Sequence, residues 1–284
     1  MEDAIRKSDV LIEALPYIKR FHNKIAVIKY GGSILGEERI RNNVLEDIVF
    51  LSFIGMRVIL VHGGGPNISE RMRNQGKKSE FIEGMRVTDN ETLKLVEEEL
   101  NKLNAMIVQE ISDLGGRVIG FSGKEDRVIQ VKKKNAEIDL GLVGEVIDIN
   151  REILLEKFKK NQILVICPMG IDIKDKVHNV NADEAASWIA SALDAEKIVL
   201  LTNVRGIMRN SEDPNSFLSS ITMLEAKKLI KDDVIQEGMI PKVEACVLAI
   251  NKGVKKAHII DARIPHALLL EIFTDSGIGT EILK

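Results

Sequence analysis

Short apolar runs separated by longer amphipathic segments are the feature that most restricts how this 284-residue chain can fold. The runs cover residues 25–28, 58–61, 163–166, 198–201 and 258–260. They are too short for typical helices, and apolar side chains on both faces are typical of strands in a covered parallel sheet. The sequence therefore predicts an α/β fold with a mainly parallel central sheet.

The segments between these runs contain helix and turn signals. Apolar residues at three- and four-residue spacing from Leu93 to Leu114 predict a long helix that begins after Asp89 and ends at Gly115 and Gly116. Capping boxes are expected where Asn181 precedes Glu184 and where Thr222 precedes Glu225. Residues 117–131 are predicted to form a hairpin and residues 142–149 a strand, so the sheet should be mixed.

Composition and charge exclude several classes of protein. A hydrophobic content of 45% and a charged content of 29% are those of an ordered globular chain. A net charge of -3 and only 4% aromatic residues disfavour binding to nucleic acid or to an anionic membrane. Cys167 and Cys246 lie far apart in apolar segments, which indicates buried free thiols rather than a disulfide or metal site. Without a signal peptide or spanning segment, a cytoplasmic location is predicted.

Two glycine clusters directly follow the first two apolar runs. Gly31 and Gly32 come after Lys29, and residues 63–65 are all glycine. At the carboxyl end of a parallel strand, residues without a Cβ let backbone N–H groups approach an anion at the start of the next helix. Each cluster alone could be a tight turn, and Lys29 alone could be a solvated strand-end charge. Together they favour an anion site.

Other glycine motifs do not match this sequence. Residues 31–36 have the spacing of a Walker A loop, but Glu37 and Glu38 stand where the lysine and hydroxyl residue are required. No G-x-G-x-x-G pattern opens a helix, which disfavours a nicotinamide-dependent oxidoreductase. The esterase interpretation of residues 62–65 also fails, because the chain has no G-x-S-x-G nucleophile motif.

Five motifs at residues 28–33, 62–66, 84–89, 179–183 and 238–242 together resemble the amino-acid kinase family, and within it the N-acetylglutamate kinases. The resemblance extends from about residue 25 to residue 282. It implies an open αβα sandwich of two lobes. Residues 25–170 would bind the acetylamino acid, residues 171–284 would bind ATP, and residues 1–24 would form an oligomerisation or regulatory helix.

The resemblance also implies a reaction. The γ-phosphoryl group of ATP would move to the γ-carboxylate of N-acetyl-L-glutamate, giving an acyl phosphate used in arginine biosynthesis. Mg²⁺ would be held mainly by the nucleotide phosphates, without a dedicated protein site. Because a carboxylate is already ionised at neutral pH, no general base is needed. Charge repulsion between acceptor and ATP is the obstacle, so fixed cations and N–H donors are required.

Residue roles follow from the match to the family's motifs. The catalytic residues implied are Lys29, Lys242 and Asp183, with Asp183 holding the two ammonium groups. The implied substrate-binding residues are Gly64, Gly65, Arg86 and Asn179. The implied nucleotide-binding residues are Gly31, Gly32, Thr202, Asn203, Gly206 and Lys242, and Asn203 departs from the aspartate that the family usually carries. Taken singly, Asp183 could be an acidic residue in a first helical turn, Arg86 a surface arginine, and Asn179 a loop residue.

Both ends of the chain resemble the arginine-inhibited members of the family. Residues before Lys24 form an amphipathic helical pattern in which Pro16 is expected to cause a kink or break. Such a helix links dimers into a hexamer in those members, so a homo-oligomer is expected. We hypothesise feedback inhibition by L-arginine, with Tyr17, His266, Glu271 and Gly277 near the inhibitor.

Two alternatives remain open at this stage. The chain could phosphorylate a related acid such as N-acetyl-aminoadipate, glutamate, aspartate or carbamate, because the phosphoryl apparatus would be shared. It could also be a non-catalytic sensor of arginine or nucleotide. Acyl phosphate formation, trapped as a hydroxamate, distinguishes these possibilities.

Overall fold

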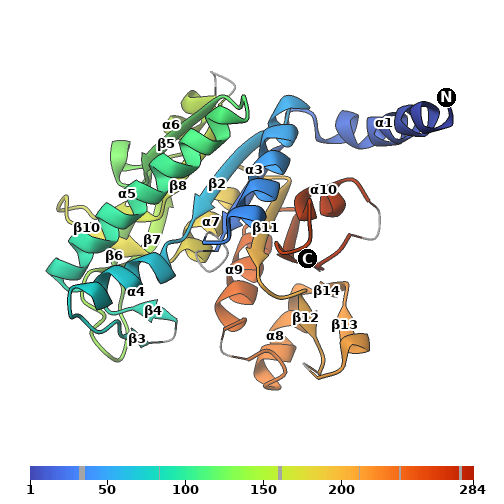
Figure 1. Ribbon diagram of the computed structural model, residues 1–284. Coiled ribbons are helices and arrows are strands. Elements are labelled where there is room, and N and C mark those ends of the chain that lie inside the picture. Colours follow the sequence, from blue (N-terminus) through green and yellow to red (C-terminus); the bar gives the residue numbers. More distant parts are fainter. Residues whose placement is uncertain (32–35, 83, 159–161, 211, 237, 275–276) are drawn as a thin grey trace.

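A long twisted sheet runs through the molecule, with helices packed on both of its faces (Figure 1). The computed structural model describes residues 1–31, 36–82, 84–158, 162–210, 212–236, 238–274 and 277–284. Within these residues the main sheet has eight strands, in the order β14-β16-β15-β11-β1-β2-β8-β5. In chain order they are β1 (Ile25–Tyr30), β2 (Arg57–His62), β5 (Val118–Ser122), β8 (Ile163–Cys167), β11 (Lys197–Thr202), β14 (Ser220–Thr222), β15 (Lys256–Asp261) and β16 (Thr280–Leu283).

The five apolar runs form the parallel centre of this sheet, as predicted. Strand β1 pairs in parallel with both β11 and β2, and β8 and β15 extend the parallel ladder on either side. Strand β16 runs antiparallel to β15, so the sheet is mixed. Successive side chains of β1 enter opposite cores, because Ala26 and Ile28 belong to one buried cluster and Val27 to the other. The prediction of an αβα sandwich is confirmed.

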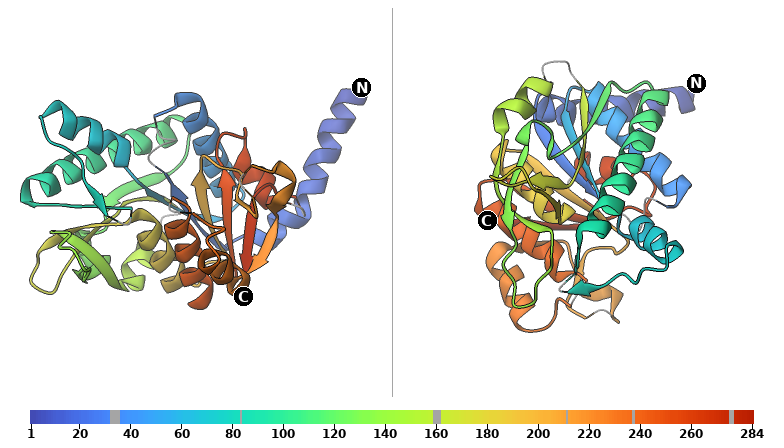
Figure 2. Two further views of the ribbon diagram at one scale, coloured as in Figure 1. Left: turned by 90° about the horizontal axis from the view of Figure 1, so that it is seen from below. Right: turned by 90° about the vertical axis from the view of Figure 1, so that its left-hand side faces the viewer.

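The helices form the two outer layers (Figure 2). Side chains of α3 and α5 pack in the cluster that contains Ala26 and Ile28, while side chains of α7 and α9 pack in the cluster that contains Val27. The helix that begins after Asp89 is present, and its cap is confirmed because an Asp89 Oδ1 accepts a hydrogen bond from the Thr92 N–H at 2.7 Å. The helices are α1 (Glu2–Phe21), α3 (Glu38–Phe53), α4 (Gly65–Asn74), α5 (Asn90–Asp113), α6 (Arg151–Phe158), α7 (Ala182–Ala192), α8 (Met223–Lys231), α9 (Ile240–Asn251) and α10 (Ala267–Ile272).

Smaller strands lie outside the main sheet. A small closed barrel contains β6 (Ile129–Lys133), β7 (Val143–Ile149), β9 (Met169–Ile171) and β10 (Val177–Val180). Two short antiparallel pairs complete the described strands: β3 (Phe81–Ile82) with β4 (Met85–Arg86), and β12 (Ile207–Met208) with β13 (Phe217–Leu218). Single 3₁₀ turns cover Glu125–Arg127 and Pro214–Ser216.

Three local predictions were wrong. Residues 117–131 are not a hairpin, because β5 pairs with β8 in the main sheet whereas β6 pairs with β7 in the barrel. The expected kink or break at Pro16 is wrong in respect of the break, since α1 continues through Pro16 to Phe21. Asn181 caps α7, but the Glu184 carboxylate does not complete a capping box. Instead it accepts hydrogen bonds from the Val146 N–H and from Lys134.

In the part of the chain that the structure describes, none of the helices is long and apolar enough to span a bilayer.

Candidate active site

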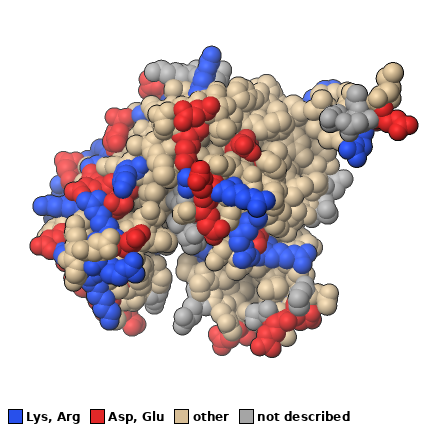
Figure 3. Space-filling view, in the orientation of Figure 1, with Lys and Arg blue, Asp and Glu red and all other residues tan. Residues whose placement is uncertain are grey.

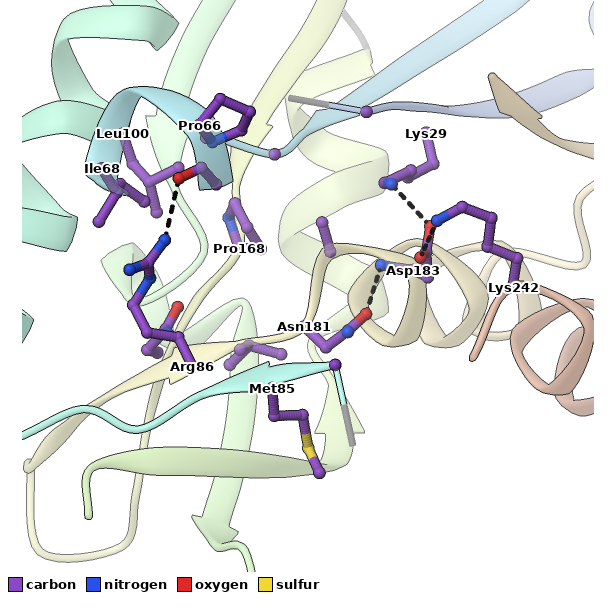
Figure 4. A pocket seen from close by; sticks show the side chains of 18 of the residues that line it. Lys29, Pro66, Ile68, Met85, Arg86, Leu100, Pro168, Asn181, Asp183 and Lys242 are labelled. Atoms are coloured by element: carbon purple, nitrogen blue, oxygen red, sulfur yellow. Dashed lines mark hydrogen bonds and ion pairs between the residues drawn. The ribbon is translucent and has the colours of Figure 1, made fainter. Parts of the chain in front are cut away.

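A cavity of about 340 Å³ lies at the carboxyl ends of β1, β2 and β11 and at the start of α7 (Figure 4). On the face shown in Figure 3, the surface is hollowed between the region of α4 and the region of α8. The parallel strands bring residues distant in sequence to one edge of the sheet. The predicted site residues that line the cavity are Lys29, Gly31, Gly64, Gly65, Arg86, Asn179, Asp183, Thr202, Asn203 and Lys242.

The centre of the cavity contains a carboxylate held between two ammonium groups. Lys29 Nζ lies 2.9 Å from Asp183 Oδ1, and Lys242 Nζ lies 3.1 Å from Asp183 Oδ2. The three side chains come from β1, α7 and α9, and Figure 4 shows both lysines pointing toward the aspartate. Lys29 and Asp183 have side chains only 8% and 7% exposed, whereas Lys242 is 25% exposed. One negative charge thus faces two positive charges at the wall of the cavity, with Lys29 and Asp183 largely buried.

Burial and charge set the protonation of this cluster. Burial lowers the pKa of Lys29 below its usual value, and the neighbouring Lys242 lowers it further, while the Asp183 carboxylate opposes both effects. Burial alone would raise the pKa of Asp183, but the two ammonium groups outweigh it and hold this pKa below the ordinary value. Asp183 is therefore ionised at neutral pH, and with both lysines protonated the cluster has a net positive charge suited to an anion.

The helix cap positions Asp183. Asn181 Oδ1 accepts a hydrogen bond from the Asp183 N–H at 2.8 Å and a weaker one from the Glu184 N–H at 3.2 Å. Asp183 therefore lies in the first turn of α7, where the helix dipole further favours its negative charge.

Arg86 lies on the other side of the cavity and is 5% exposed, so it is not a surface arginine. Its guanidinium donates to Ser69 Oγ at 2.7 Å, to Ser79 Oγ at 2.7 Å and to the Gly65 carbonyl at 2.9 Å. Within the described residues no carboxylate pairs with it. Burial lowers the pKa of Arg86 from its usual value, but an arginine still keeps its charge. Arg86 is thus a buried cation held only by neutral groups.

Ser69 and Ser79, which hold Arg86, were not recognised in the sequence. Ser69 lies within α4 and Ser79 lies between α4 and β3. No sequence pattern singles out these two serines, because their relation to Arg86 arises only when the β3–β4 pair packs against α4.

Asn179 and the glycines complete the wall nearest Arg86. Asn179 Nδ2 donates to Thr88 Oγ1 at 3.3 Å, and this hydrogen bond orients the Asn179 amide group. A Cβ at Gly64 would lie 2.9 Å from Leu100 Cδ2 and 3.1 Å from Leu103 Cδ1, so a side chain there would displace these two leucines. Helix α5 therefore packs directly against the glycine loop.

The residues predicted to bind nucleotide are only partly brought together. Gly31, Thr202 and Asn203 line the cavity, and the Thr202 hydroxyl is used to shape the following turn, because it donates to the Val204 carbonyl at 2.8 Å. Gly206 is not among the cavity residues. A Cβ at Gly206 would lie 2.5 Å from Thr280 Oγ1, so this glycine allows a close approach to β16. Gly32 lies outside the described residues.

Comparison with known proteins gives a consistent result. The model of the amino acid kinase family matches residues 24–261. The chain belongs to the amino acid kinase family.

Relatives with high sequence identity are acetylglutamate kinases. The chain is 47% identical over 283 residues to the acetylglutamate kinase of Petrotoga mobilis, covering 99% of this chain and 95% of the relative. It is 45% identical over 295 residues to that of Methanocaldococcus jannaschii, covering 100% and 98% of the two chains. The sequence resemblance is thereby confirmed, and this amino acid kinase is an enzyme.

Solved structures show the same fold at lower identity. N-acetylglutamate synthase from Neisseria gonorrhoeae, complexed with coenzyme A and N-acetyl-glutamate, superposes with a TM-score of 0.86 at 24% identity over 96% of this chain. The chain spans only 62% of the length of that synthase. Carbamate kinase from Giardia superposes with a TM-score of 0.68 at 18% identity, covering 92% of this chain and 99% of the other.

A second cavity of this amino acid kinase, about 510 Å³, lies between α1 and the C-terminal segment. Tyr17, Glu271 and Gly277 line it, as do Lys197 and His258. Glu271 is fixed from two sides, because its Oε2 accepts from the Ile278 N–H at 2.8 Å and its Oε1 lies 2.5 Å from His258 Nδ1.

His266 does not line this second cavity, although the sequence grouped it with Glu271. Its Nδ1 lies 2.7 Å from an oxygen of the buried Asp47 on α3. The same carboxylate accepts from the Leu268 N–H at 3.2 Å, so His266 and Asp47 together fix the start of α10.

No cluster of three or more His, Cys, Asp or Glu side chains suitable for a metal ion occurs among the residues that the structure describes. Both oxygens of Asp183 are engaged by the two lysines.

Proposed function

We propose that this protein transfers the γ-phosphoryl group of ATP to the γ-carboxylate of N-acetyl-L-glutamate, a step of arginine biosynthesis. The arrangement of Lys29, Asp183 and Lys242 in one cavity with Arg86 carries the proposal. Residues 25–170 would hold the acetylamino acid and residues 171–284 the nucleotide. The names of the relatives support this substrate, because they are acetylglutamate kinases over nearly the whole chain.

The chemistry demands neutralisation of charge rather than a base. The acceptor carboxylate and the triphosphate are both anions, and they must approach in line. Lys29 and Lys242 would flank the transferred group, and Asp183 would hold their ammonium groups apart at fixed positions. Preorganised cations and N–H donors of this kind lower the barrier because they need no rearrangement as charge develops.

Arg86 is the group best suited to the substrate's other carboxylate. It is a buried cation whose described partners are neutral oxygens, the Met72 sulfur and the Phe81 ring, whose centroid lies 4.5 Å from Arg86 Cζ. A carboxylate that replaced a serine hydroxyl would form charge-assisted hydrogen bonds with the planar guanidinium. Asn179, on the same wall, would hydrogen-bond the acetylamino group or the same carboxylate.

ATP with Mg²⁺ is the phosphoryl donor in this proposal. Gly31, Thr202, Asn203 and Lys242 would contact the nucleotide. Gly32 and Gly206 were also predicted to contact it, but Gly32 lies outside the described residues and Gly206 does not line the cavity. The described residues that line the cavity offer cations and N–H groups, and each Asp183 oxygen faces a lysine ammonium group. This set of groups fits a metal ion held mainly by the nucleotide phosphates, where it would neutralise part of their charge.

Formation of acyl phosphate tests the function. The purified protein would be incubated with MgATP and hydroxylamine, and hydroxamate would be measured with N-acetyl-L-glutamate, N-acetyl-aminoadipate, glutamate, aspartate and carbamate. We expect the highest kcat/KM with N-acetyl-L-glutamate. A higher value with another acid would refute the substrate assignment, and binding of MgATP without hydroxamate from any acid would favour a non-catalytic sensor.

We also propose that L-arginine inhibits the enzyme from the second cavity. Glu271 supplies a fixed carboxylate for a guanidinium or amino group, and Lys197 is a buried cation for a carboxylate. Both charges of an amino acid therefore have partners beside Tyr17 and Gly277. Unchanged hydroxamate formation at millimolar arginine would contradict this proposal.

Assembly through α1 is proposed on the basis of its position. The helix projects from the rest of the molecule in Figures 1 and 2, and Leu11 and Ile12 on it are 69% and 68% exposed. An exposed apolar helix face calls for a partner, and a second copy of this helix would pair dimers into a hexamer. Light scattering of the full chain should show a hexamer, and Leu11→Glu should reduce it to a dimer. A monomer in the full chain would contradict the assembly.

A further inference from the structure

His62 is a buried titratable side chain that the proposed mechanism leaves unused. It ends β2, directly before the glycine loop, and it is fully buried. Gly63 and Gly64 line the active-site cavity, whereas His62 does not. The imidazole therefore lies behind the loop, on the side away from the substrates.

The contacts of the imidazole determine which nitrogen carries the proton. Asn104 Nδ2 lies 3.0 Å from the Val165 carbonyl oxygen, which can only accept, so the amide group facing it must be the NH₂. The same Nδ2 lies 3.2 Å from His62 Nε2, so Nε2 must accept and cannot carry hydrogen. Burial lowers the pKa of His62 to about 4, and the ring is neutral at physiological pH. The single proton is thus on Nδ1.

Asn104 is itself held in one orientation. A Cβ at Gly120 would lie only 2.0 Å from Asn104 Oδ1, so the amide oxygen occupies the space that this glycine leaves open. A reversed amide would direct its oxygen at the Val165 carbonyl oxygen, where two acceptors cannot form a hydrogen bond, so this orientation is disfavoured. The tautomer of His62 therefore follows from the packing of α5 against β5 and β8.

The proton on Nδ1 fixes the peptide between Gly63 and Gly64. His62 Nδ1 lies 3.2 Å from the Gly63 carbonyl oxygen and donates to it. The Gly63 N–H donates to the Tyr30 carbonyl at 2.9 Å, and the Gly64 carbonyl accepts from the Ile68 N–H at 2.9 Å. The Gly64 N–H is the remaining polar group of this peptide, and it has no acceptor among the described residues. In a trans peptide this N–H points opposite to the Gly63 carbonyl, away from His62 and toward the cavity.

We propose that His62, kept in its Nδ1-protonated form by Asn104, is a positioning residue that aims the Gly64 N–H at the transferred phosphoryl group. This inference rests on the proposed function. Without the Nδ1 donor, the Gly63–Gly64 peptide has no buried partner to fix its plane, and two adjacent glycines rotate easily. The misaligned N–H would lose contact with charge that develops in the transition state, so kcat should fall more than either KM rises.

Two substitutions at His62 separate positioning from packing. The amide nitrogen of Asn lies at the same distance along the side chain as Nδ1, whereas that of Gln corresponds to Nε2. We expect His62→Asn to have a kcat at least about 10-fold above that of His62→Gln, because loss of one aligned donor lowers kcat by roughly 10²–10³-fold. The KM values for acid and ATP should differ less than about threefold between the two variants. A side chain needed only to fill space would give the opposite order, since Gln is closer to His in volume.

Cys167→Ala is the matched control. Cys167 Sγ lies 3.5 Å from His62 Nε2 and packs against the same ring without touching the Gly63 carbonyl. Its removal perturbs the packing and leaves the Nδ1 donor intact, so kcat should stay within about threefold of the unmodified enzyme. A loss in this variant as large as in His62→Gln would overturn the proposal, as would equal kcat values for the Asn and Gln variants.

The tautomer can be measured without any activity assay. Long-range proton–nitrogen NMR correlations of the full chain distinguish the two neutral forms of histidine, and His62→Asn identifies the signal. We expect a neutral ring protonated on Nδ1 at pH 7, and a proton on Nε2 would overturn the inference. If the unmodified enzyme forms no acyl phosphate from N-acetyl-L-glutamate, the proposed substrate assignment is refuted. The ratio of the Asn and Gln variants, measured with the acid that is phosphorylated, would still decide the role of His62.

Discussion

Replacing Asp183 by Asn would remove the one negative charge between Lys29 and Lys242 while keeping the size of the side chain. Coulomb's law at an effective dielectric of about 20 gives about 6 kcal/mol for the Lys29–Asp183 pair at 2.9 Å and about 5 kcal/mol for the Lys242 pair at 3.1 Å. Water and side-chain movements would offset part of this. Breaking a buried pair typically costs about 3–5 kcal/mol.

The kinetic consequence is a loss of about 10²–10³-fold in kcat/KM, which corresponds to about 3–4 kcal/mol. The two ammonium groups would repel each other, and neither would remain at its position beside the phosphoryl group. The hydroxamate assay with N-acetyl-L-glutamate measures this loss directly. Asp194→Asn is the matched control, because Asp194 pairs with Arg151 at the exposed far end of α7, where we expect less than a twofold change.

The pH profile of the Asp183→Asn variant provides a second, sharper test. In the natural chain burial lowers the pKa of Lys29 and the Asp183 carboxylate opposes this effect. Without the carboxylate, only burial and the neighbouring Lys242 act on the pKa of Lys29, and both lower it. Lys29 would therefore lose its proton at a lower pH. Because the mechanism requires the ammonium form, the alkaline limb of kcat/KM should move to lower pH. An unshifted limb, or a loss smaller than about threefold, would refute the role given to this ion cluster.

Three further changes test other parts of the molecule. Arg86→Lys should raise the KM for the acid by at least about 10-fold, because one ammonium group cannot replace the planar guanidinium. The KM for ATP should change little, and equal effects on both KM values would contradict the role given to Arg86. Glu271→Gln should abolish inhibition by arginine and leave uninhibited turnover unchanged, as measured by arginine titration. Burial raises the pKa of Asp47 to about 6, above its ordinary value of 3.8. The protonated Asp47 carboxyl therefore stabilises the folded state below about pH 4, and this stabilisation is lost as the pH rises through 6. Relative to Asp47→Asn, the free energy of unfolding of the natural chain should fall by about 1 kcal/mol between pH 5 and pH 8, as urea titrations would show; no difference in slope would exclude this linkage.

The local errors of the sequence analysis have a common physical cause. Residues 117–131 have the alternation and turn residues of a hairpin, but Val118–Ser122 pairs instead with β8, which comes about 40 residues later in the sequence. Burial beside an apolar parallel strand outweighed the local turn signal. Glu184 likewise fits a capping box, yet its carboxylate accepts a hydrogen bond from the Val146 N–H of a distant strand.

The site could be predicted in outline because its residues sit in short motifs at strand and helix ends. Lys29, Asp183 and Lys242 each lie next to glycine, helix-cap or proline signals, and the structure brings these three side chains into contact. Gly206 and His266 were placed by motif alone, and the structure directs them elsewhere, toward Thr280 and Asp47. Neighbouring positions in a motif need not face the same cavity.

The sequence by itself determined the parallel strands, the long capped helix and the glycine loops, because these follow from side-chain period, helix caps and backbone freedom within a few residues. Only the tertiary structure decided that Arg86 is a buried cation held by Ser69 and Ser79, and that Asn104 sets the tautomer of His62. Those relations depend on burial and on hydrogen bonds between segments far apart in the chain. Such contacts leave no periodic trace in the order of the residues, because they form only when the helices pack on the sheet.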